Sequence, residues 1–218
     1  MSFHRKFRNV VLAKDARDKQ RKVGPSNLSN PCTKCLANDL LGVPQPESIY
    51  NMGAKIGTAI HGWLEELIKE HQPTWEPEQK VTLGTLGTYG RVSGSLDLYV
   101  PEDKMIVDFK TTTRVKMQGL LNEFQEDTPS GKVQAYIAQT HLYGLGAENA
   151  GKEVDRITIV FIPRDSVTYD DIRTRSVPYD REYALHVWER ALALWTWLDE
   201  ENGDPEALET DPHCYYCG

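Results

Sequence analysis

The sequence predicts an α/β fold, a small mixed β-sheet flanked by helices, whose N- and C-terminal ends are joined by a cysteine metal site. Two runs with β-strand character, 91–100 and 105–112, are separated by a short turn. The run 156–163 is apolar on both faces, which is typical of a strand inside a sheet. Apolar residues recur at helical spacing in 52–71 and 179–201.

The two adjacent runs predict a β-hairpin. Pro101–Lys104 forms its turn, because proline favours an early turn position and charged residues follow it. Pairing about the centre of this turn places Asp97 almost opposite Asp108, with Cβ atoms roughly 4.5–5.5 Å apart. Side chains alternate along each strand, so Asp108 and Lys110 share one face and Phe109 points to the other.

The remaining segments are interpreted in chain order. They are a loop entering a short helix at the first cysteine pair (Val23–Gly42), a first strand (Val81–Gly90), a segment of undetermined structure (Thr113–Gly131), a helix (Lys132–Leu145) and an edge strand or hairpin (Val167–Val177). We therefore expect a single domain over 23–218, large enough for a sizeable core.

Charge is distributed unevenly along the chain. The net charge is −7, yet residues 1–22 carry eight Lys or Arg against two Asp. Two interpretations of this basic N-terminal arm stay open, contact with a phosphate backbone and a solvated helix. Because the rest of the chain is acidic, we expect nucleic-acid contact to be confined to a channel beside the active site, with Arg114 and Lys116 as candidate phosphate contacts.

The hairpin carries a set of side chains that suits a divalent-metal phosphodiesterase. Asp97 and Asp108 supply the hard oxygen ligands that Mg²⁺ or Mn²⁺ prefers. Lys110, two residues beyond Asp108, lies on the same strand face and can orient an attacking water or offset charge on a phosphate. An exposed Asp-x-Lys pair is commonly a solvated surface pair, so the interpretation depends on further parts of the site.

Two predicted helices supply such parts. His61, on the helix 52–71, is a suitable ligand for Mn²⁺, although a lone histidine is often a core or capping residue. Gln139 and Tyr143 lie one turn apart on the helix 132–145, where they can hold a phosphate or a metal-bound water. The alternative is an amphipathic helix whose tyrosine is half-buried.

In this order, the motifs Gly57-Thr-Ala-Ile-His61, Gly94-Ser-Leu-Asp97, Asp108-Phe-Lys110 and Gln139-x-x-x-Tyr143 resemble the RecB-like branch of the PD-(D/E)xK nuclease superfamily. The resemblance spans roughly residues 24–218 and implies a restriction-endonuclease-like core. It also implies roles for these residues: metal ligands His61, Asp97 and Asp108 with the Phe109 carbonyl, Lys110 serving the water nucleophile, and Gln139 with Tyr143 completing the site. The second acidic position, often Glu in that family, is Asp108 here.

The four cysteines form two C-x-x-C pairs, Cys32 with Cys35 and Cys214 with Cys217. Four thiolates can hold one tetrahedral Zn²⁺ or a [4Fe-4S] cluster, and both stay open. Disulfides are less favoured because nothing marks the chain as secreted. The arrangement resembles the cysteine staple of CRISPR-adaptation exonucleases and of AddB, but there one N-terminal cysteine pairs with three C-terminal ones. The staple would close a loop of about 180 residues.

Together the sequence and the resemblance predict a Mg²⁺- or Mn²⁺-dependent deoxyribonuclease, an exonuclease on single-stranded DNA or DNA ends, in recombination, repair or DNA processing. Two alternatives are a structure-specific endonuclease or nickase that works with a helicase or recombination partner, and a non-catalytic DNA-end binding module. The sequence has no P-loop motif, no apolar run that could span a membrane and no signal-peptide pattern at its start, so we expect a cytoplasmic protein without its own ATPase.

Overall fold

The structure is a computed structural model that describes residues 2, 3, 5, 7, 22–43, 52–124, 131–211 and 214. The predicted basic arm over 1–22 lies almost entirely outside these residues. The described part of the chain forms a central β-sheet with helices on both sides, as predicted. No helix among the described residues has the length and apolar character needed to cross a bilayer.

Five strands form one mixed sheet in the order of the chain. They are β1 (Glu76–Leu86), β2 (Gly90–Val100), β3 (Met105–Thr112), β4 (Arg156–Pro163) and β5 (Arg173–Pro178). All neighbours are antiparallel except β3 and β4, which run parallel. This parallel pair requires a crossover, because parallel strands cannot be joined by a tight turn.

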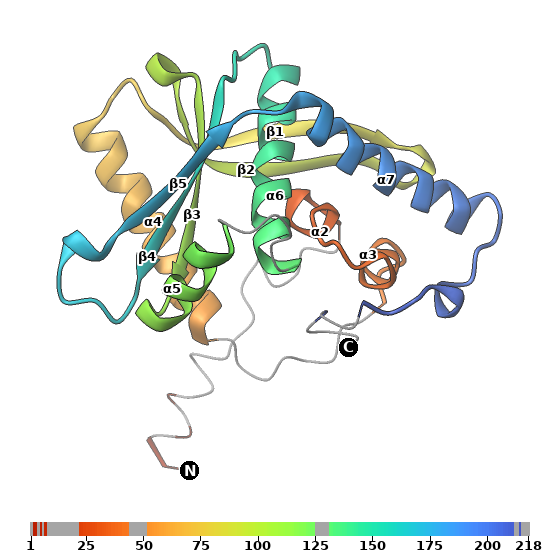
Figure 1. The fold of residues 1–218 in the computed structure, drawn as a ribbon, viewed down its shortest axis with the longest axis horizontal. Coiled ribbons are helices and arrows are strands. Elements are labelled where there is room, and N and C mark those ends of the chain that lie inside the picture. The colour runs from red at the N-terminus through yellow and green to blue at the C-terminus, as the bar shows by residue number, and fades with distance from the viewer. Residues whose placement is uncertain are drawn as a thin grey trace.

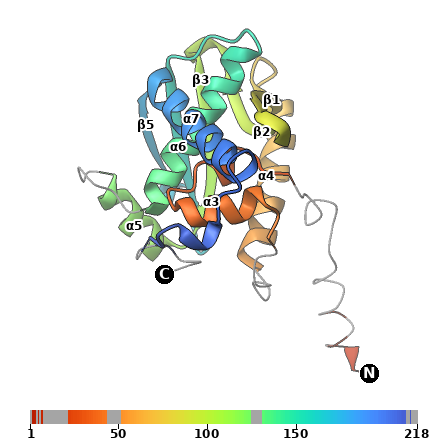
Figure 2. The same cartoon turned by 90° about the vertical axis from the view of Figure 1, so that its right-hand side faces the viewer.

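The crossover and the remaining helices cover the sheet (Figure 1). They are α2 (Pro25–Leu28), α3 (Thr33–Leu40), α4 (Met52–His71), α5 (Arg114–Glu123), α6 (Gly131–Asn149) and α7 (Arg181–Asp199). The helix α4 lies on one face, and α6 and α7 lie on the other with α2 and α3 beside them (Figures 1 and 2). The crossover from β3 to β4 consists of α5 and α6.

Two apolar layers account for this arrangement. On one face, Ile68 of α4 packs with Leu98, Val100 and Val107 of the hairpin strands. On the other face, the buried residues of α6 and of the strands form one cluster, and those of α2, α3, α6, α7, β1 and β2 form another. Trp188, Trp195 and Trp197 of α7 are partly buried against the second of these clusters.

The predicted hairpin is correct in register but short. Leu98 pairs with Val107, and Val100 pairs with Met105, as pairing about the turn centre requires. Beyond Leu98 the ladder between β2 and β3 stops, whereas β3 continues to pair with β4 along its whole length. The two hairpin strands therefore separate at Asp97, and this separation opens the place where the candidate site lies.

Several element boundaries differ from the sequence-based prediction. The first strand begins at Glu76 rather than Val81 and ends at Leu86, because Gly87 has φ of +48° and starts a 3₁₀ turn over Gly87–Tyr89. The undetermined segment contains α5, whose first turn is capped by the Thr113 side chain accepting from the Lys116 N–H. The edge strand is shorter than predicted, and the helix α6 is four residues longer at its C-terminal end.

Candidate functional site

The candidate site begins where β2 and β3 separate. Asp97 is the first residue of β2 past the paired stretch, and its Oδ2 accepts a hydrogen bond of 2.7 Å from the Phe109 N–H. This bond takes the place of the missing ladder contact and fixes the carboxylate against the backbone of β3. The position of Asp97 therefore follows from the end of the pairing between β2 and β3 at Leu98, which leaves the Phe109 N–H free to bind its carboxylate.

His61 reaches the same point from α4. Its Nε2 lies 3.0 Å from the Phe109 carbonyl oxygen, and its Nδ1 lies 3.3 Å from Asp97 Oδ1. Both partners can only accept, so this geometry favours an imidazole protonated on both nitrogens. Burial acts to lower the pKa of His61, but the hydrogen bond and charge of Asp97, with the charge of Asp108, together raise it.

The glycines of two motifs allow this close packing. A Cβ on Gly57 would lie 2.9 Å from Thr111 Oγ1, so a glycine there lets α4 approach β3. A Cβ on Gly94 would lie 2.6 Å from the Pro25 ring and 3.3 Å from Tyr143. Neither glycine has a positive φ, so close approach, and not backbone freedom, explains these two positions.

Asp108 is the buried carboxylate of the site, with 1% of its surface exposed. Lys110 Nζ lies 2.8 Å from Oδ2, but Oδ2 has no hydrogen-bond partner among the described residues, so this ion pair lacks the direction of a hydrogen bond. Burial raises the pKa of Asp108 to about 6 against the opposing effect of Lys110, and the charge of Asp97 raises it further.

Lys110 is held by three groups on the face opposite α4. Besides its ion pair with Asp108, its Nζ donates to Gln139 Oε1 at 2.9 Å and lies 4.8 Å from the centre of the Tyr136 ring. Gln139 in turn donates through Nε2 to the Tyr143 hydroxyl at 3.3 Å. Burial raises the pKa of Tyr143, with smaller contributions from nearby carboxylates, so its hydroxyl stays protonated.

The structure therefore brings the sequence-predicted site residues to one place. They are His61, Asp97, Asp108, Phe109 through its carbonyl, Lys110, Gln139 and Tyr143. The residues come from two strands of the sheet, β2 and β3, and from two helices, α4 and α6, that cover its opposite faces (Figure 1). The two faces meet here because β2 and β3 have separated.

Sequence reasoning missed two neighbours of these residues. Glu78 of β1 has a carboxylate oxygen within 4.8 Å of ligand atoms of His61 and Asp97, and Tyr136 lies one turn before Gln139 with its ring beside Lys110. Glu78 was hidden because the predicted strand began at Val81, after it. Tyr136 shares a helical face with Gln139 at i, i+3 spacing, which is the signal that could have identified it.

The donor set fits a hard divalent cation. Carboxylate oxygens, one carbonyl oxygen and an imidazole are ligands that Mg²⁺ and Mn²⁺ accept. Asp108 Oδ2 is a buried acceptor with unfilled capacity among the described residues. Lys110 already pairs with this carboxylate, and one ion held by Asp97 and Asp108 would use its remaining acceptor capacity and lower the cost of its burial further.

The predicted phosphate contacts differ in their surroundings. Arg114 Nε lies 3.5 Å from Asp171, and its backbone N–H donates to Asp165, so its side chain is directed to the loop after β4. Lys116 is exposed on α5. Burial lowers the pKa of Lys132, and the charges of Lys116 and Lys110 lower it further against the opposing charge of Glu123, so these three lysines lie near one another with Glu123 among them.

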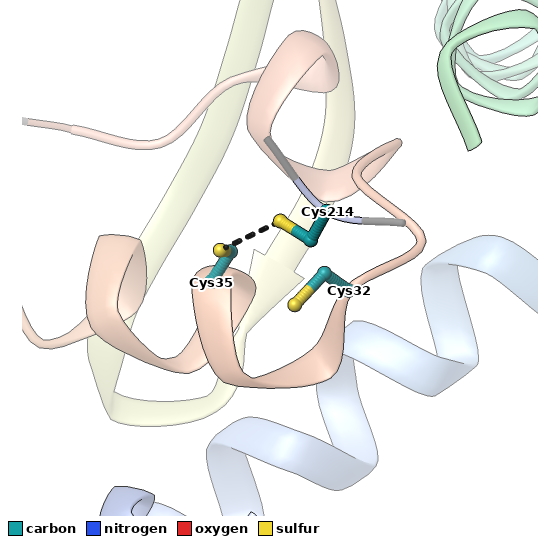
Figure 3. A group of neighbouring side chains, drawn as sticks. All are labelled: Cys32, Cys35 and Cys214. Atoms are coloured by element: carbon teal, nitrogen blue, oxygen red, sulfur yellow. Dashed lines mark hydrogen bonds between the residues drawn. The ribbon is translucent and has the colours of Figure 1, made fainter. Parts of the chain in front are cut away.

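The second constellation lies away from this site. Cys32 caps the N-terminus of α3, Cys35 lies in its first turn, and Cys214 comes from the C-terminal segment (Figure 3). The sulfurs of Cys35 and Cys214 are 3.3 Å apart, and the three sulfurs all lie within 4.8 Å of one another. Cys217 lies outside the described residues. Three thiols from opposite ends of the chain thus meet in a geometry that suits a thiophilic metal.

Two contacts hold the chain ends around these cysteines. The Arg190 guanidinium of α7 donates to the carbonyl oxygens of Leu28, Asn30 and Pro31, at 2.9, 2.5 and 3.1 Å, and so fixes the loop that precedes Cys32. Lys34 forms an ion pair of 2.8 Å with Glu206 in the C-terminal segment. The cysteine cluster is therefore part of a wider junction between the two ends.

No protein-family model matches the chain, and no curated protein matches it. Its fold is similar to the crystal structures of two exonucleases. A phage-related exonuclease from Haemophilus somnus 129PT is 19% identical with a TM-score of 0.53, over 88% of this chain and 91% of that one. The alkaline exonuclease LHK-Exo from Laribacter hongkongensis is 12% identical with a TM-score of 0.54, over 83% and 89%. These likenesses show a shared fold over most of each chain.

Proposed function

We propose that this chain is a divalent-metal-dependent deoxyribonuclease that hydrolyses phosphodiester bonds as an exonuclease on single-stranded DNA or DNA ends. The observation that carries the proposal is the convergence of His61, Asp97 and Asp108 with Lys110 where β2 and β3 separate. Three ionisable metal ligands and one lysine at the place where two strands separate can together support metal-assisted hydrolysis of a phosphodiester, which none of them supports alone.

In this proposal Asp97, Asp108, His61 and the Phe109 carbonyl hold Mg²⁺ or Mn²⁺. The bound ion supplies a water of lowered pKa and offsets the charge of the phosphate. Lys110 lies beside Asp108 at 2.8 Å, so it is placed to orient the water or to stabilise charge on the phosphate oxygens. Gln139 and Tyr143 fix the direction of Lys110, since Gln139 accepts from Nζ and donates to the tyrosine hydroxyl.

The choice of DNA as substrate is supported by the similar structures. Both are named exonucleases, and the one from Laribacter hongkongensis is also known as a complex with dAMP, at a TM-score of 0.50 to this chain. The acidic net charge of −7 supports a substrate path restricted to the region of Lys110, Lys116 and Lys132.

The experiment that tests this function is a cleavage assay with Mg²⁺ or Mn²⁺ on linear DNA labelled at the 5′ or the 3′ end, and on closed circular DNA. We expect metal-dependent release of nucleotides from one labelled end and an intact circle. The variant Lys110→Ala should lose this activity, whereas Lys104→Ala, a lysine paired with Glu153 at the distant hairpin turn, should keep it.

Other outcomes select the alternatives. Cleavage of the closed circle would replace the exonuclease with an endonuclease or nickase, because a circle has no end. DNA binding without cleavage under any metal would leave a non-catalytic end-binding module. Equal activity of wild type and Lys110→Ala would contradict the assignment of the site itself.

We further propose that Cys32, Cys35, Cys214 and Cys217 hold a structural Zn²⁺ or [4Fe-4S] cluster. The sulfur separations within 4.8 Å support a mononuclear ion, since Zn–S bonds of about 2.3 Å at tetrahedral angles separate sulfurs by roughly 3.8 Å. A colourless protein with one zinc per chain is the expected result of metal analysis. A brown protein absorbing near about 400 nm would instead identify an iron–sulfur cluster.

A further inference from the structure

We propose that Lys132 binds one backbone phosphate of the DNA strand, next to the phosphate that Lys110 serves, and that the ring of Tyr136 holds the two lysines in place for this. The bound group is an internal phosphodiester that is not itself hydrolysed. This inference rests on the proposed function and deepens it, because it assigns a residue that holds the strand beside the reacting phosphate. Such a contact positions a nucleic acid without reading its sequence.

The first support is the Tyr136 ring, which has two ammonium groups from different elements beside it. Lys110 Nζ, from β3, lies 4.8 Å from the ring centre, and Lys132 Nζ, from the first turn of α6, lies 5.8 Å from it. Both are within the distance of about 6 Å at which a cation is attracted to an aromatic ring. The ring also packs against Phe161, with centres 6.4 Å apart, and the Tyr136 carbonyl accepts from the Thr140 hydroxyl. Tyr136 is therefore a fixed point between the two lysines.

The second support is the difference between these two lysines in their other contacts. Lys110 is paired with Asp108 and donates to Gln139, so its ammonium group is already held within the protein. Lys132 is exposed, and in the part of the chain that the structure describes no carboxylate forms an ion pair with it and no group accepts a hydrogen bond from it. Its ammonium group is therefore accessible to an anion from outside the protein.

The third support is the charge around Lys132. The charges of Lys116 and Lys110 act to lower its pKa, and the charge of Glu123 acts to raise it. Because Lys110 is balanced by Asp108, Lys132 and Lys116 together oppose Glu123. This leaves an excess of one positive charge, which is the charge that one phosphodiester neutralises. A bound phosphate would also relieve the repulsion between the lysines.

The position of Lys132 on α6 relates this subsite to the catalytic centre. Lys132, Tyr136 and Gln139 follow one another at spacings of four and three residues, so they share one face of the helix. Gln139 contacts Lys110, at one end of this row, and Lys132 lies in the first turn of α6, at the other. The N-terminal end of a helix favours negative charge. A strand that follows this row from the catalytic centre therefore meets Lys132 with its next phosphate.

The first measurement is the affinity of the full chain for a fluorescent single-stranded oligonucleotide at several salt concentrations, in buffer without Mg²⁺ or Mn²⁺. For single strands, the slope of log affinity against log salt changes by about 0.7 for each phosphate contact. We expect Lys132→Gln to lose about 0.7 of this slope and to bind every sequence more weakly. The control Lys104→Gln, whose lysine pairs with Glu153 at the hairpin turn, should keep the wild-type slope.

The second measurement locates the phosphate. Substrates carry one neutral methylphosphonate linkage at successive positions beside the cleaved bond, and their cleavage is measured with Mg²⁺. For wild type, we expect the neutral linkage to raise KM about tenfold at one position next to the cleaved bond. For Lys132→Gln, KM should be raised on the unmodified substrate, and the neutral linkage at that position should raise it no further, because the two changes remove the same contact.

Variants of Tyr136 test whether its ring positions the lysines. Tyr136→Leu removes the ring, so it should raise KM as Lys132→Gln does and also lower kcat, because Lys110 loses the same support. Tyr136→Phe retains the ring and should recover most of both losses. The melting temperatures of the two variants show whether each is folded.

The outcomes distinguish the two proposals. If wild type cleaves DNA and Lys132→Gln has the wild-type salt slope, Lys132 is a solvated surface lysine and only the subsite is overturned. If the two proteins differ only on strands that carry a terminal phosphate, the bound group is a strand end, which contradicts an internal phosphodiester. A wild type that shows the expected salt dependence but cleaves no DNA overturns the proposed function and keeps the phosphate contact. Absence of both binding and cleavage overturns both proposals.

Discussion

At the scale of single residues, Asp108 illustrates a conflict between stability and activity. Its pKa, raised to about 6 by burial, means that the ionised carboxylate destabilises the fold at pH above about 6, and that this penalty disappears as the pH falls below that value. At pH 8 without divalent ions, we expect Asp108→Asn to be at least as stable as wild type. Its free energy of unfolding should be higher by roughly 1 kcal/mol, and its melting temperature should be equal or higher.

The same substitution should abolish catalysis, because it removes a charged ligand. We expect a loss of about a thousandfold or more in the rate of DNA cleavage. Asp103→Asn, on the exposed turn between β2 and β3, serves as the control and should change neither quantity. A large fall in the melting temperature of Asp108→Asn would show that its ion pair with Lys110 outweighs its burial.

The grouping of site residues was predictable in part. Asp97, Asp108 and Lys110 lie close in sequence on one hairpin, so strand alternation and turn position placed them together correctly. Glu78 was not predictable, because its position depends on a positive φ and on a strand boundary that hydrophobic periodicity does not define. Local patterns thus located the residues of one hairpin and not those that enter from elsewhere.

At the scale of elements, the junction of α6 and α7 contains a buried histidine. His141 lies between the rings of Tyr179 and Tyr183, and its Nδ1 accepts from the Asp180 N–H at 3.2 Å. Burial lowers the pKa of His141 to about 4, against the effect of Asp180. The unfolded chain takes up this proton near pH 6.5, so the contribution to stability is intact above about pH 6.5 and is lost as the pH falls toward 4.

The measurement is the free energy of urea unfolding at several pH values between 8 and 5. We expect wild type to lose about 2 kcal/mol more than His141→Gln between pH 8 and pH 5, since glutamine retains an acceptor and does not titrate. His71→Gln, at the exposed end of α4, should follow wild type. Parallel curves for wild type and His141→Gln would contradict a neutral buried histidine.

Alanine substitutions at two helical glycines are expected to change the stability of the protein in opposite directions. A Cβ on Gly144 of α6 would lie 2.5 Å from the Tyr179 ring, which is held by its bond to Glu148. Gly144→Ala should therefore destabilise the protein by about 1–3 kcal/mol through overpacking. Gly119 of α5 has open space around it, so Gly119→Ala should stabilise by about 0.5–1 kcal/mol through helix propensity.

Thermal unfolding of these two variants beside wild type decides the point. Equal shifts in the same direction would mean that helix propensity, and not the contact with Tyr179, governs both positions. The comparison is one of stability and needs no assumption about catalysis, although Gly144 follows Tyr143 of the candidate site in the chain.

Element types were predicted more reliably than element boundaries and order. The 20-residue helix α4 was predicted with its observed ends, because its apolar stripe is long and regular. The helix α5 was not, since ten residues with a weak apolar stripe resemble a loop. The parallel pairing of β3 with β4 was also not predicted, because it depends on how α5 and α6 cross the sheet and not on either strand's pattern.

At the scale of the whole molecule, the cysteine junction should contribute to global stability. We expect Cys35→Ser, or removal of the metal by a chelator, to lower the free energy of unfolding by about 3–5 kcal/mol, as loss of a long-range crosslink does. Chelator should have no further effect on Cys35→Ser. The control Lys34→Gln breaks the neighbouring ion pair with Glu206 and should cost less than about 1 kcal/mol, because the Glu206 side chain is exposed to solvent.

The measurement is chemical unfolding of wild type and both variants, with and without chelator. An unfolding midpoint of wild type that does not respond to chelator would show that the three clustered thiols do not carry a stabilising metal. If Lys34→Gln lowers the free energy of unfolding as much as Cys35→Ser does, the contacts around the cysteines, and not a metal, provide the stabilisation.

The meeting of Cys35 with Cys214, 179 positions apart, also determines how the molecule responds to mechanical force. Every strand of the sheet lies between these two residues in the chain. If the proposed ion is bound there, tension applied to the two ends passes through it and leaves the sheet unloaded until its bonds to sulfur rupture. In an optical trap, the intact protein should extend in one late step of nearly its full contour length, and Cys35→Ser should yield at lower force.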